Sequence, residues 1–127
     1  MQSKRTGEAG EAYAVALLER ESYKIIARNF HSVYGEVDII ALDMESICFV
    51  EVKTRKKNSL STGQEAITPK KQLNLIRTAL CFLQERAEFE EFQPRFDVCV
   101  VNLEENGIPS CHEYLKAAFD GGVYEGN

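Results

Sequence analysis

The stretch GEVDIIALDMESICFVEVKT, residues 35–54, decides the fold of this 127-residue chain. Residues 35–42 and 46–54 are rich in Val, Ile and Phe, which favour β-strands. The polar turn Asp43-Met44-Glu45-Ser46 between them is typical of a hairpin. The stretch therefore predicts two antiparallel neighbouring strands.

The turn also predicts which side chains of this hairpin lie opposite each other. A loop centred on Met44-Glu45 fixes the register, and side chains alternate between the two faces of a strand. The expected opposed pairs are Leu42 with Ile47, Ile40 with Phe49, Asp38 with Glu51 and Glu36 with Lys53. The opposite face is expected to carry only apolar or small residues: Val37, Ile39, Ala41, Cys48, Val50 and Val52.

Asp38 and Glu51 are like charges in directly opposed positions, which destabilise a sheet unless a cation lies between them. Mg²⁺ or Mn²⁺ would relieve the repulsion, because both prefer carboxylate oxygens and water. Lys53 is the other cation expected on this face. The charges lie only at the end of a pair that is apolar elsewhere, so we expect the pair to open there into a cleft. In the alternative interpretation these charges are ordinary salt-bridging groups on an exposed face.

The flanking sequence predicts an α/β protein in the order α-β-β-β-α-β, with a possible further strand. An amphipathic helix is expected over residues 7–20, with the apolar stripe Ala9, Ala12, Tyr13, Ala16 and Leu17. Residues 23–30 and 94–101 predict strands, Asn106-Gly107 predicts a turn, and residues 110–115 form the possible last strand. We expect one domain over residues 1–119 and a flexible tail over 120–127.

A second helix is expected to begin at Thr68, with Thr68 as N-cap and Pro69 at the first helical position. Its expected apolar face is Leu73, Ile76, Leu80 and Leu83, ending near Arg86. Lys70 and Lys71 lie in its first turn, where positive charge opposes the helix dipole. A helix start binds anions, so these lysines predict a phosphate contact; two exposed lysines are the plain alternative.

Composition gives a mixed indication about partners. The net charge is -5, which disfavours binding to nucleic acid. Residues 52–78 nevertheless hold seven basic residues against Glu65 alone, so one region is basic within an acidic chain. This asymmetry is compatible with phosphate binding.

The remaining features exclude several other classes. The cysteines Cys48, Cys81, Cys99 and Cys111 are widely spaced, and the two histidines do not complete a zinc set, so we expect reduced thiols. No stretch approaches the roughly 20 apolar residues of a membrane span, and the N-terminus has no apolar signal region. We expect a cytoplasmic protein without a membrane partner.

Several motifs together resemble one family. They are GEAGE (7–11), Asn29-Phe30, GEVDII (35–40), FVEVKTR (49–55) and RFDV (95–98). They resemble the YraN-like family of small bacterial proteins, which is similar to the PD-(D/E)xK nucleases and, among them, to Holliday junction resolvases. The resemblance extends from Gly7 to about Phe119. It implies a restriction-endonuclease-like mixed sheet with flanking helices. The proline that usually precedes the first Asp of that superfamily is replaced here by Val37.

The resemblance also assigns roles to residues. It implies that Asp38, Glu51 and Glu11 bind Mg²⁺ or Mn²⁺, that Lys53 is the catalytic lysine, and that Glu36 supports them. From the residues alone Glu11 would count as a surface group. The basic region adds expected contacts to DNA from Arg55, Lys56, Lys57, Gln64, Lys70 and Lys71.

Three functions follow as hypotheses. The first is a metal-dependent endonuclease that hydrolyses DNA, with branched or irregular DNA as the substrate suggested by the resemblance; by analogy with resolvases, a homodimer fits the cutting of paired strands. The second is a nucleic-acid-binding module that keeps the fold and has little or no catalytic activity. The third is a structural α/β protein whose charges are incidental.

Overall fold

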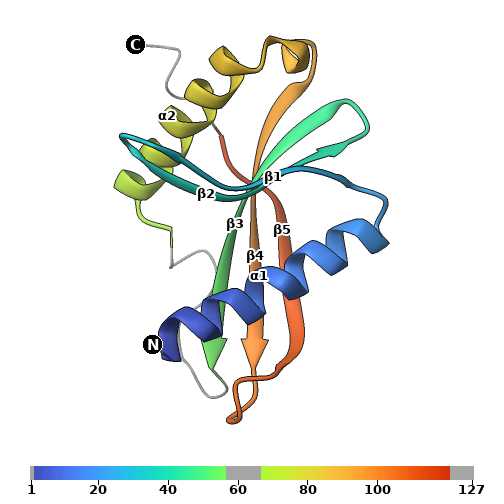
Figure 1. Cartoon of the computed structure of the whole chain (residues 1–127), viewed down its shortest axis with the longest axis vertical. Helices are drawn as coiled ribbons and strands as arrows, with labels where there is room; N and C mark the ends of the chain where they lie inside the picture. The colour runs from blue at the N-terminus through green and yellow to red at the C-terminus, as the bar shows by residue number, and fades with distance from the viewer. Residues whose placement is uncertain (1, 57–66, 121–127) are drawn as a thin grey trace.

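The computed structural model describes residues 2–56 and 67–120, which form a five-stranded sheet with a long helix on each face (Figure 1). This arrangement confirms the predicted α/β class and the presence of the last strand. The elements are α1 (Gln2–Arg20), β1 (Lys24–Ser32), β2 (Gly35–Asp43), β3 (Ser46–Lys56), α2 (Pro69–Glu85), the 3₁₀ helix η2 (Ala87–Phe89), β4 (Gln93–Leu103) and β5 (Pro109–Phe119).

The sheet is mixed, with the strands in the order β1-β2-β3-β4-β5. All neighbouring pairs are antiparallel except β3 and β4, which run parallel. Antiparallel neighbours can be joined by a tight turn, whereas a parallel pair needs a long crossover, and α2 lies in the crossover between β3 and β4. In Figure 1, α1 crosses the strands in the lower half, and α2 lies beside the β1–β2 hairpin in the upper half.

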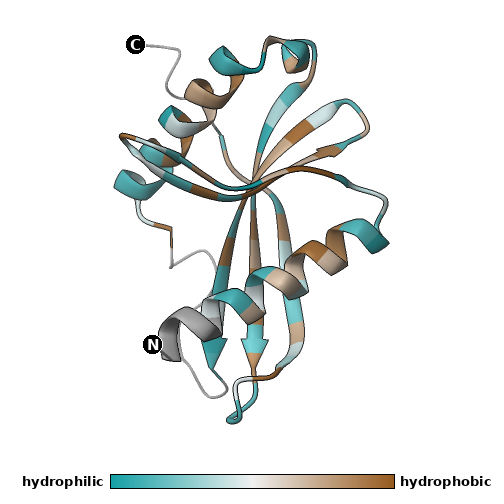
Figure 2. Cartoon of the chain, in the orientation of Figure 1, coloured by the Kyte–Doolittle hydropathy of each residue, from teal (hydrophilic) through white to brown (hydrophobic). Residues whose placement is uncertain are grey.

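Each helix covers its own hydrophobic core (Figure 2). The core under α1 contains Ala14, Leu17 and Leu18 from the helix, packed on Ile39, Ala41, Cys48, Val50, Cys99 and Val101. The core under α2 contains Leu75, Ile76, Ala79 and Phe82, packed on Val37, Ile40, Ile47, Phe49 and Phe96. Alternate residues of β3 thus enter opposite cores, as strand geometry requires. Val37 departs from the prediction, because it packs under α2 although Ile39 packs under α1.

The buried face of α1 differs from the predicted stripe. Ala12 and Ala16 are exposed, whereas Gly10, Ala14 and Leu18 are buried. The two faces lie side by side on one helix, and small alanines on both made the apolar pattern ambiguous. The face that packs is the one on which Gly10 lets the helix approach β3: a Cβ added at Gly10 would lie 2.3 Å from Thr54 Cγ2.

The start of α2 agrees with the prediction. Thr68 is the N-cap, its hydroxyl accepts a hydrogen bond from the Lys71 main-chain N–H at 3.1 Å, and Pro69 is the first helical residue. The predicted apolar face is wrong at Leu80, which is 48% exposed, while Ala79 and Phe82 are buried. Neither α1 nor α2, the long helices in the described part of the chain, is long and apolar enough to cross a membrane.

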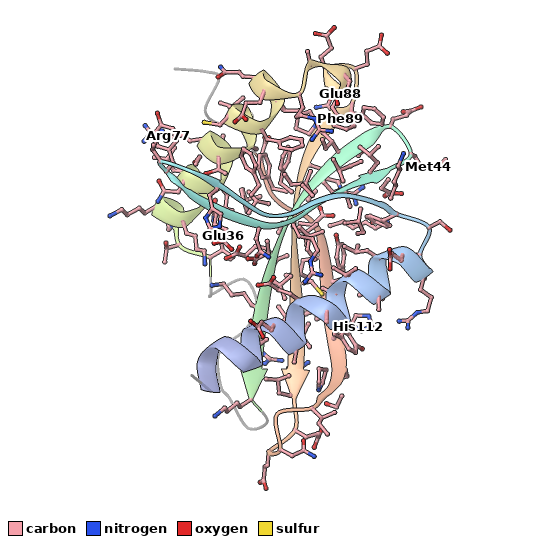
Figure 3. All side chains as sticks on the ribbon, in the orientation of Figure 1. Glu36, Met44, Arg77, Glu88, Phe89 and His112 are labelled. Atoms are coloured by element: carbon pink, nitrogen blue, oxygen red, sulfur yellow. The ribbon has the colours of Figure 1, made fainter. Side chains whose placement is uncertain are left out.

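The cysteines are thiols, two of them buried, and His112 contacts α1. All four cysteines are unpaired thiols, and burial raises the pKa of Cys48 and of Cys99 to about 12, which keeps both protonated. His112 of β5 lies beside α1, where its Nδ1 forms a 2.8 Å hydrogen bond with the Tyr13 hydroxyl (Figure 3). The hydrogen bond between Tyr13 and His112 attaches α1 to β5. The raised thiol pKa values of Cys48 and Cys99 do not favour a reactive thiolate.

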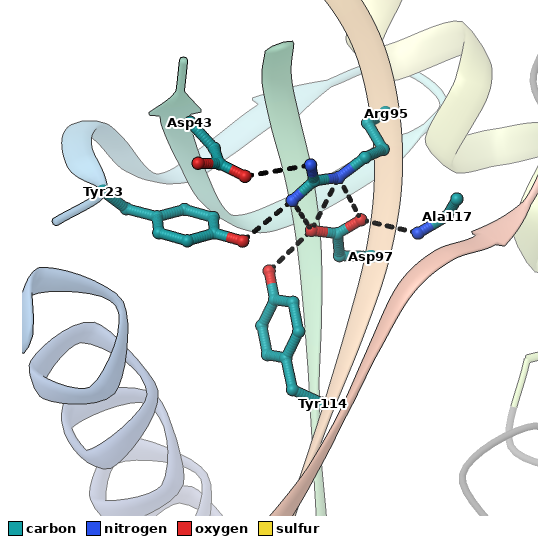
Figure 4. A network of polar contacts seen from close by, with 6 residues as sticks. All are labelled: Tyr23, Asp43, Arg95, Asp97, Tyr114 and Ala117. Carbon is teal, nitrogen blue, oxygen red and sulfur yellow. Dashed lines mark hydrogen bonds and ion pairs between the residues drawn. The ribbon is translucent and has the colours of Figure 1, made fainter. Parts of the chain in front are cut away.

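A polar network centred on Asp97 holds β4 and β5 together (Figure 4). The Asp97 side chain is buried, and it accepts hydrogen bonds from Arg95, from the Tyr114 hydroxyl at 2.7 Å and from the Ala117 N–H at 2.9 Å. Arg95 also donates to Asp43 at 3.0 Å and to Tyr23 at 2.9 Å. The network links β4 to β5 and, through Arg95, to Asp43 at the end of β2, which is a structural role.

Candidate active site

The site begins where β2 separates from β3. The predicted register is confirmed from Asp43 and Ser46 to Ile39 and Val50, where the paired residues end. Beyond that point the Val52 N–H donates a 2.8 Å hydrogen bond to Asp38 Oδ2. The main-chain ladder has therefore been replaced by a contact between a side chain and the main chain, and Asp38 is held against β3.

Glu51 lies at the centre of the site and is 4% exposed. Its Oε2 atom is 3.6 Å from Lys53 Nζ and forms a second, closer ion pair with Lys71 Nζ from the first turn of α2. The charge of Glu51 also acts on the neighbouring carboxyl group of Asp38. The structure therefore brings Asp38, Glu51 and Lys53 together, and it adds Lys71.

Glu11 of α1 approaches the same region from the other side of the hairpin. Its side chain is 20% exposed, and its Oε1 is 4.0 Å from Arg28 Nη2. With the Asn29 amide nitrogen turned toward the carboxylates, Asn29 donates 3.1 Å hydrogen bonds to both Glu11 Oε1 and Glu36 Oε1. Asn29 thus bridges the two acidic side chains.

The bridge depends on an unusual backbone conformation. Asn29 has a φ of 53°, in the left-handed region that asparagine tolerates better than most residues. β1 also carries a β-bulge between Ile25 and Ala27. Both irregularities fall within β1, and the left-handed backbone at Asn29 accompanies the contacts of its side chain with Glu11 and Glu36.

The carboxyl groups interact unfavourably in the absence of a metal. Burial, the charge of Glu51 and a hydrogen bond that protonated Asp38 donates to Glu51 raise the pKa of Asp38 to about 8, although the Val52 N–H opposes the shift. Burial also raises the pKa of Glu11, with smaller contributions from Glu36 and Glu51. Asp38 therefore retains a proton near neutral pH in the metal-free protein.

The two lysines respond in opposite ways. Burial and the neighbouring Lys71 lower the pKa of Lys53, against the attraction of Glu51. Burial is the largest single influence on Lys71 and acts to lower its pKa, but the hydrogen bond to Glu51, the neighbouring Lys53 and the charges of Glu51 and Asp38 together raise it. Lys71 is therefore the ammonium group that neutralises Glu51, and Lys53 is the lysine that loses its proton more readily.

The donor set fits a divalent cation at two of the three predicted positions. Asp38 and Glu51 have adjacent carboxyl groups, and a cation between them would remove their repulsion. Mg²⁺ and Mn²⁺ prefer carboxylate oxygens as ligands. Within the described ranges, no three acidic, histidine or cysteine side chains are gathered closely enough to hold a metal ion. Metal binding by Asp38 and Glu51, with Glu11 as a third ligand, therefore remains a prediction.

The predicted nucleic-acid contacts fall into separate groups. Lys70 and Lys71 line a groove of about 300 Å³ between the β1–β2 turn and α2, together with Tyr34, Gly35, Glu36, Thr68, Asn74 and Leu75. Arg55 instead donates a 3.0 Å hydrogen bond to Asn102, and Lys56 is exposed at the end of β3. Lys57 and Gln64 lie outside the described residues.

The ladder ends before two of the four predicted pairs, Asp38 with Glu51 and Glu36 with Lys53, and three contributors were not found from the sequence. Glu36 does not oppose Lys53, because the β2–β3 register ends before Glu36. Its Oε2 atom lies 3.3 Å from Nδ1 of His31 instead (Figure 3 labels Glu36). The unexpected contributors are Lys71 as a partner of Glu51, Asn29 as a bridge and the Val52 N–H. The motif Asn29-Phe30 was noticed in the sequence, but nothing in it indicated the role of Asn29.

Comparisons with known proteins agree on one family. Residues 10–101 match the uncharacterised protein family UPF0102. A UPF0102 protein of Geotalea daltonii is 40% identical over 118 residues, which cover 93% of this chain and 91% of the relative. One of Syntrophus aciditrophicus is 39% identical over 94% of this chain and 91% of its own, and one of Francisella tularensis is 37% identical over 94% and 97%. The chain therefore belongs to the UPF0102 family.

Proposed function

We propose that this protein is a divalent-metal-dependent endonuclease that hydrolyses phosphodiester bonds in DNA. The observation that supports it most is the pair of adjacent carboxyl groups of Asp38 and Glu51, with Lys53 beside them, at the point where β2 leaves β3. A structural protein has no need to bury Glu51 against the Asp38 carboxyl group, an arrangement that raises the pKa of Asp38. The resemblance to PD-(D/E)xK nucleases agrees with this assignment.

Each residue has a role that its surroundings support. Asp38 and Glu51 would hold Mg²⁺ or Mn²⁺, with Glu11 as the expected third ligand, and the metal would supply an activated water and withdraw charge from the phosphoryl oxygen. The Val52 N–H keeps Asp38 in place. Lys53, with its lowered pKa, would orient the attacking water or stabilise the charge that develops on the phosphate.

The proposed substrate is DNA, entering along the groove that Lys70 and Lys71 line. Lysines at a helix start suit phosphate groups, because the free amides and the dipole there also favour an anion. A preference for branched or irregular DNA, and a homodimer that cuts paired strands, are supported by the resemblance to resolvases.

Cleavage assays test the proposal. Single-stranded, duplex, nicked and four-way-junction DNA are incubated with the protein, with and without Mn²⁺. We expect Mn²⁺-dependent cleavage that Asp38→Ala and Lys53→Met abolish, and that Glu45→Gln, an exposed change in the β2–β3 turn, preserves. Cleavage that Asp38→Ala leaves unchanged would refute the assignment.

A second candidate is a nucleic-acid-binding module with this fold and little or no catalysis. The ion pair between Lys71 and Glu51 favours it, because an internal cation already neutralises the central carboxylate. Metal titration separates the two candidates: a binding module takes up no divalent ion at Asp38 and Glu51, yet its affinity for DNA still falls when Lys70 is replaced.

A further inference from the structure

Two ammonium groups meet at a single oxygen atom in this site. Glu51 Oε2 contacts both Lys53 Nζ and Lys71 Nζ. The lysines differ in origin, because Lys53 belongs to β3 next to Glu51, whereas Lys71 arrives from α2. Lys71 is therefore the cation that can leave without any change in the strand that carries Glu51.

The surroundings of Lys71 show where it could go. Its side chain is 38% exposed and lines the groove that also contains Lys70. The first turn of α2 contains no acidic residue, so no carboxylate of that turn offsets the positive end of the helix dipole. Once Lys71 loses Glu51, its ammonium group and the helix start would both face the groove, whose one acidic lining residue among the described residues, Glu36, already contacts Asn29 and His31.

From this arrangement, and resting on the proposed metal site, we infer that Lys71 occupies the metal-binding oxygen of Glu51 until a divalent cation displaces it, and that the released lysine then binds a phosphate group of the substrate in the groove. Metal and Lys71 compete for one carboxylate. Metal and phosphate, by contrast, bind cooperatively, because metal binding frees the Lys71 ammonium group, which can then bind the phosphate. The site would thus accept DNA in its metal-loaded state.

Titration with Mn²⁺ alone tests the competition. Lys71→Met removes the competing cation and is expected to tighten Mn²⁺ binding about fivefold, at the upper end of the range for ion pairs that solvent reaches, because Lys71 is partly exposed. Lys70→Met is the matched control, because it removes a neighbouring charge from the same groove without touching Glu51, so its effect on Mn²⁺ affinity should be much smaller. Glu51→Gln, which removes the shared ligand, should weaken binding in either background.

The ammonium resonance of Lys71 gives a second readout that does not depend on activity. Mg²⁺ should move the NMR signal of the Lys71 ammonium group toward that of a solvated lysine and leave that of Lys70 nearly unchanged. The inference is overturned if Lys71→Met binds Mn²⁺ no more tightly than the unaltered protein, or if Mg²⁺ binds without moving the Lys71 signal. In either case Mn²⁺ binding that Glu51→Gln abolishes would leave the proposed nuclease site standing. Absence of Mn²⁺ binding in every variant would overturn both.

Discussion

The main-chain N–H of Val52 donates to Oδ2 of Asp38 over 2.8 Å at the position where β2 and β3 stop pairing. This hydrogen bond replaces the next main-chain bond of the ladder. It keeps the Asp38 carboxyl group next to that of Glu51, although the two strands diverge. The opening of the hairpin is therefore what creates a site between them.

The first prediction concerns pH and the metal-free protein. The pKa of Asp38 rises from 3.8 to about 8 on folding, so the folded state binds the extra proton. Its contribution to stability is complete below pH 4 and is lost as the pH rises toward 8. In EDTA, the free energy of unfolding of the unaltered protein relative to Asp38→Asn should fall across this window. Denaturant titrations at several pH values measure it; a flat difference would contradict the raised pKa.

The second prediction concerns added metal. A cation that binds only the folded protein stabilises it by about 2.7 kcal/mol at a hundred times its dissociation constant. Mg²⁺ or Mn²⁺ at pH 8 should therefore raise the melting temperature of the unaltered protein. Glu51→Gln should abolish the increase, and Glu45→Gln should preserve it. An equal increase in Glu51→Gln would place the metal elsewhere.

The third prediction concerns how closely α1 approaches the sheet. A Cβ at residue 10 would lie 2.3 Å from Thr54 Cγ2, whereas a Cβ at residue 7 meets nothing within 4 Å. Gly10→Ala should cost about 1–3 kcal/mol from overpacking, while Gly7→Ala should stabilise the helix by up to about 1 kcal/mol. Thr54→Ser removes the clashing methyl group and should restore part of the loss in the double variant. Chemical denaturation of the unaltered protein, the three single variants and the double variant measures these differences.

The fourth prediction concerns the Asp97 network. Asp97→Ala leaves Arg95 without its buried partner and should cost about 3–5 kcal/mol, as expected when a buried ion pair is broken. Tyr114→Phe removes only one hydrogen bond and should cost about 1 kcal/mol. If Asp97→Ala were no more destabilising than Tyr114→Phe, the network would not be what holds β5 on β4.

The sequence was sufficient for features that depend on neighbouring residues. The short turn at Met44 fixed the register that places Ile40 opposite Phe49 and brings Asp38 close to Glu51. The N-cap at Thr68 was predictable for the same reason, because it depends only on Thr68 and the residues that follow it. Alternation of side chains then placed Glu51 and Lys53 on one face of β3.

Other features depend on the three-dimensional arrangement and could not be read from the pattern. Lys71 reaches Glu51 only because α2 packs over β3 after a long connection, and a first-turn lysine alone indicates no such contact. The left-handed conformation of Asn29 is permitted by its side chain but is not required by it. Glu36 would face Lys53 only in an ideal ladder that continued past the point where β2 and β3 separate.

The central claim is that Asp38 and Glu51 hold a divalent metal, and a crystal structure of the protein soaked in Mn²⁺ tests it most directly. The account predicts an anomalous-scattering peak within about 2.0–2.3 Å of oxygens from both carboxylates, with the Lys71 ammonium group moved away from Glu51. A structure with no peak between these residues, and with Lys71 still paired with Glu51 at saturating Mn²⁺, would contradict it.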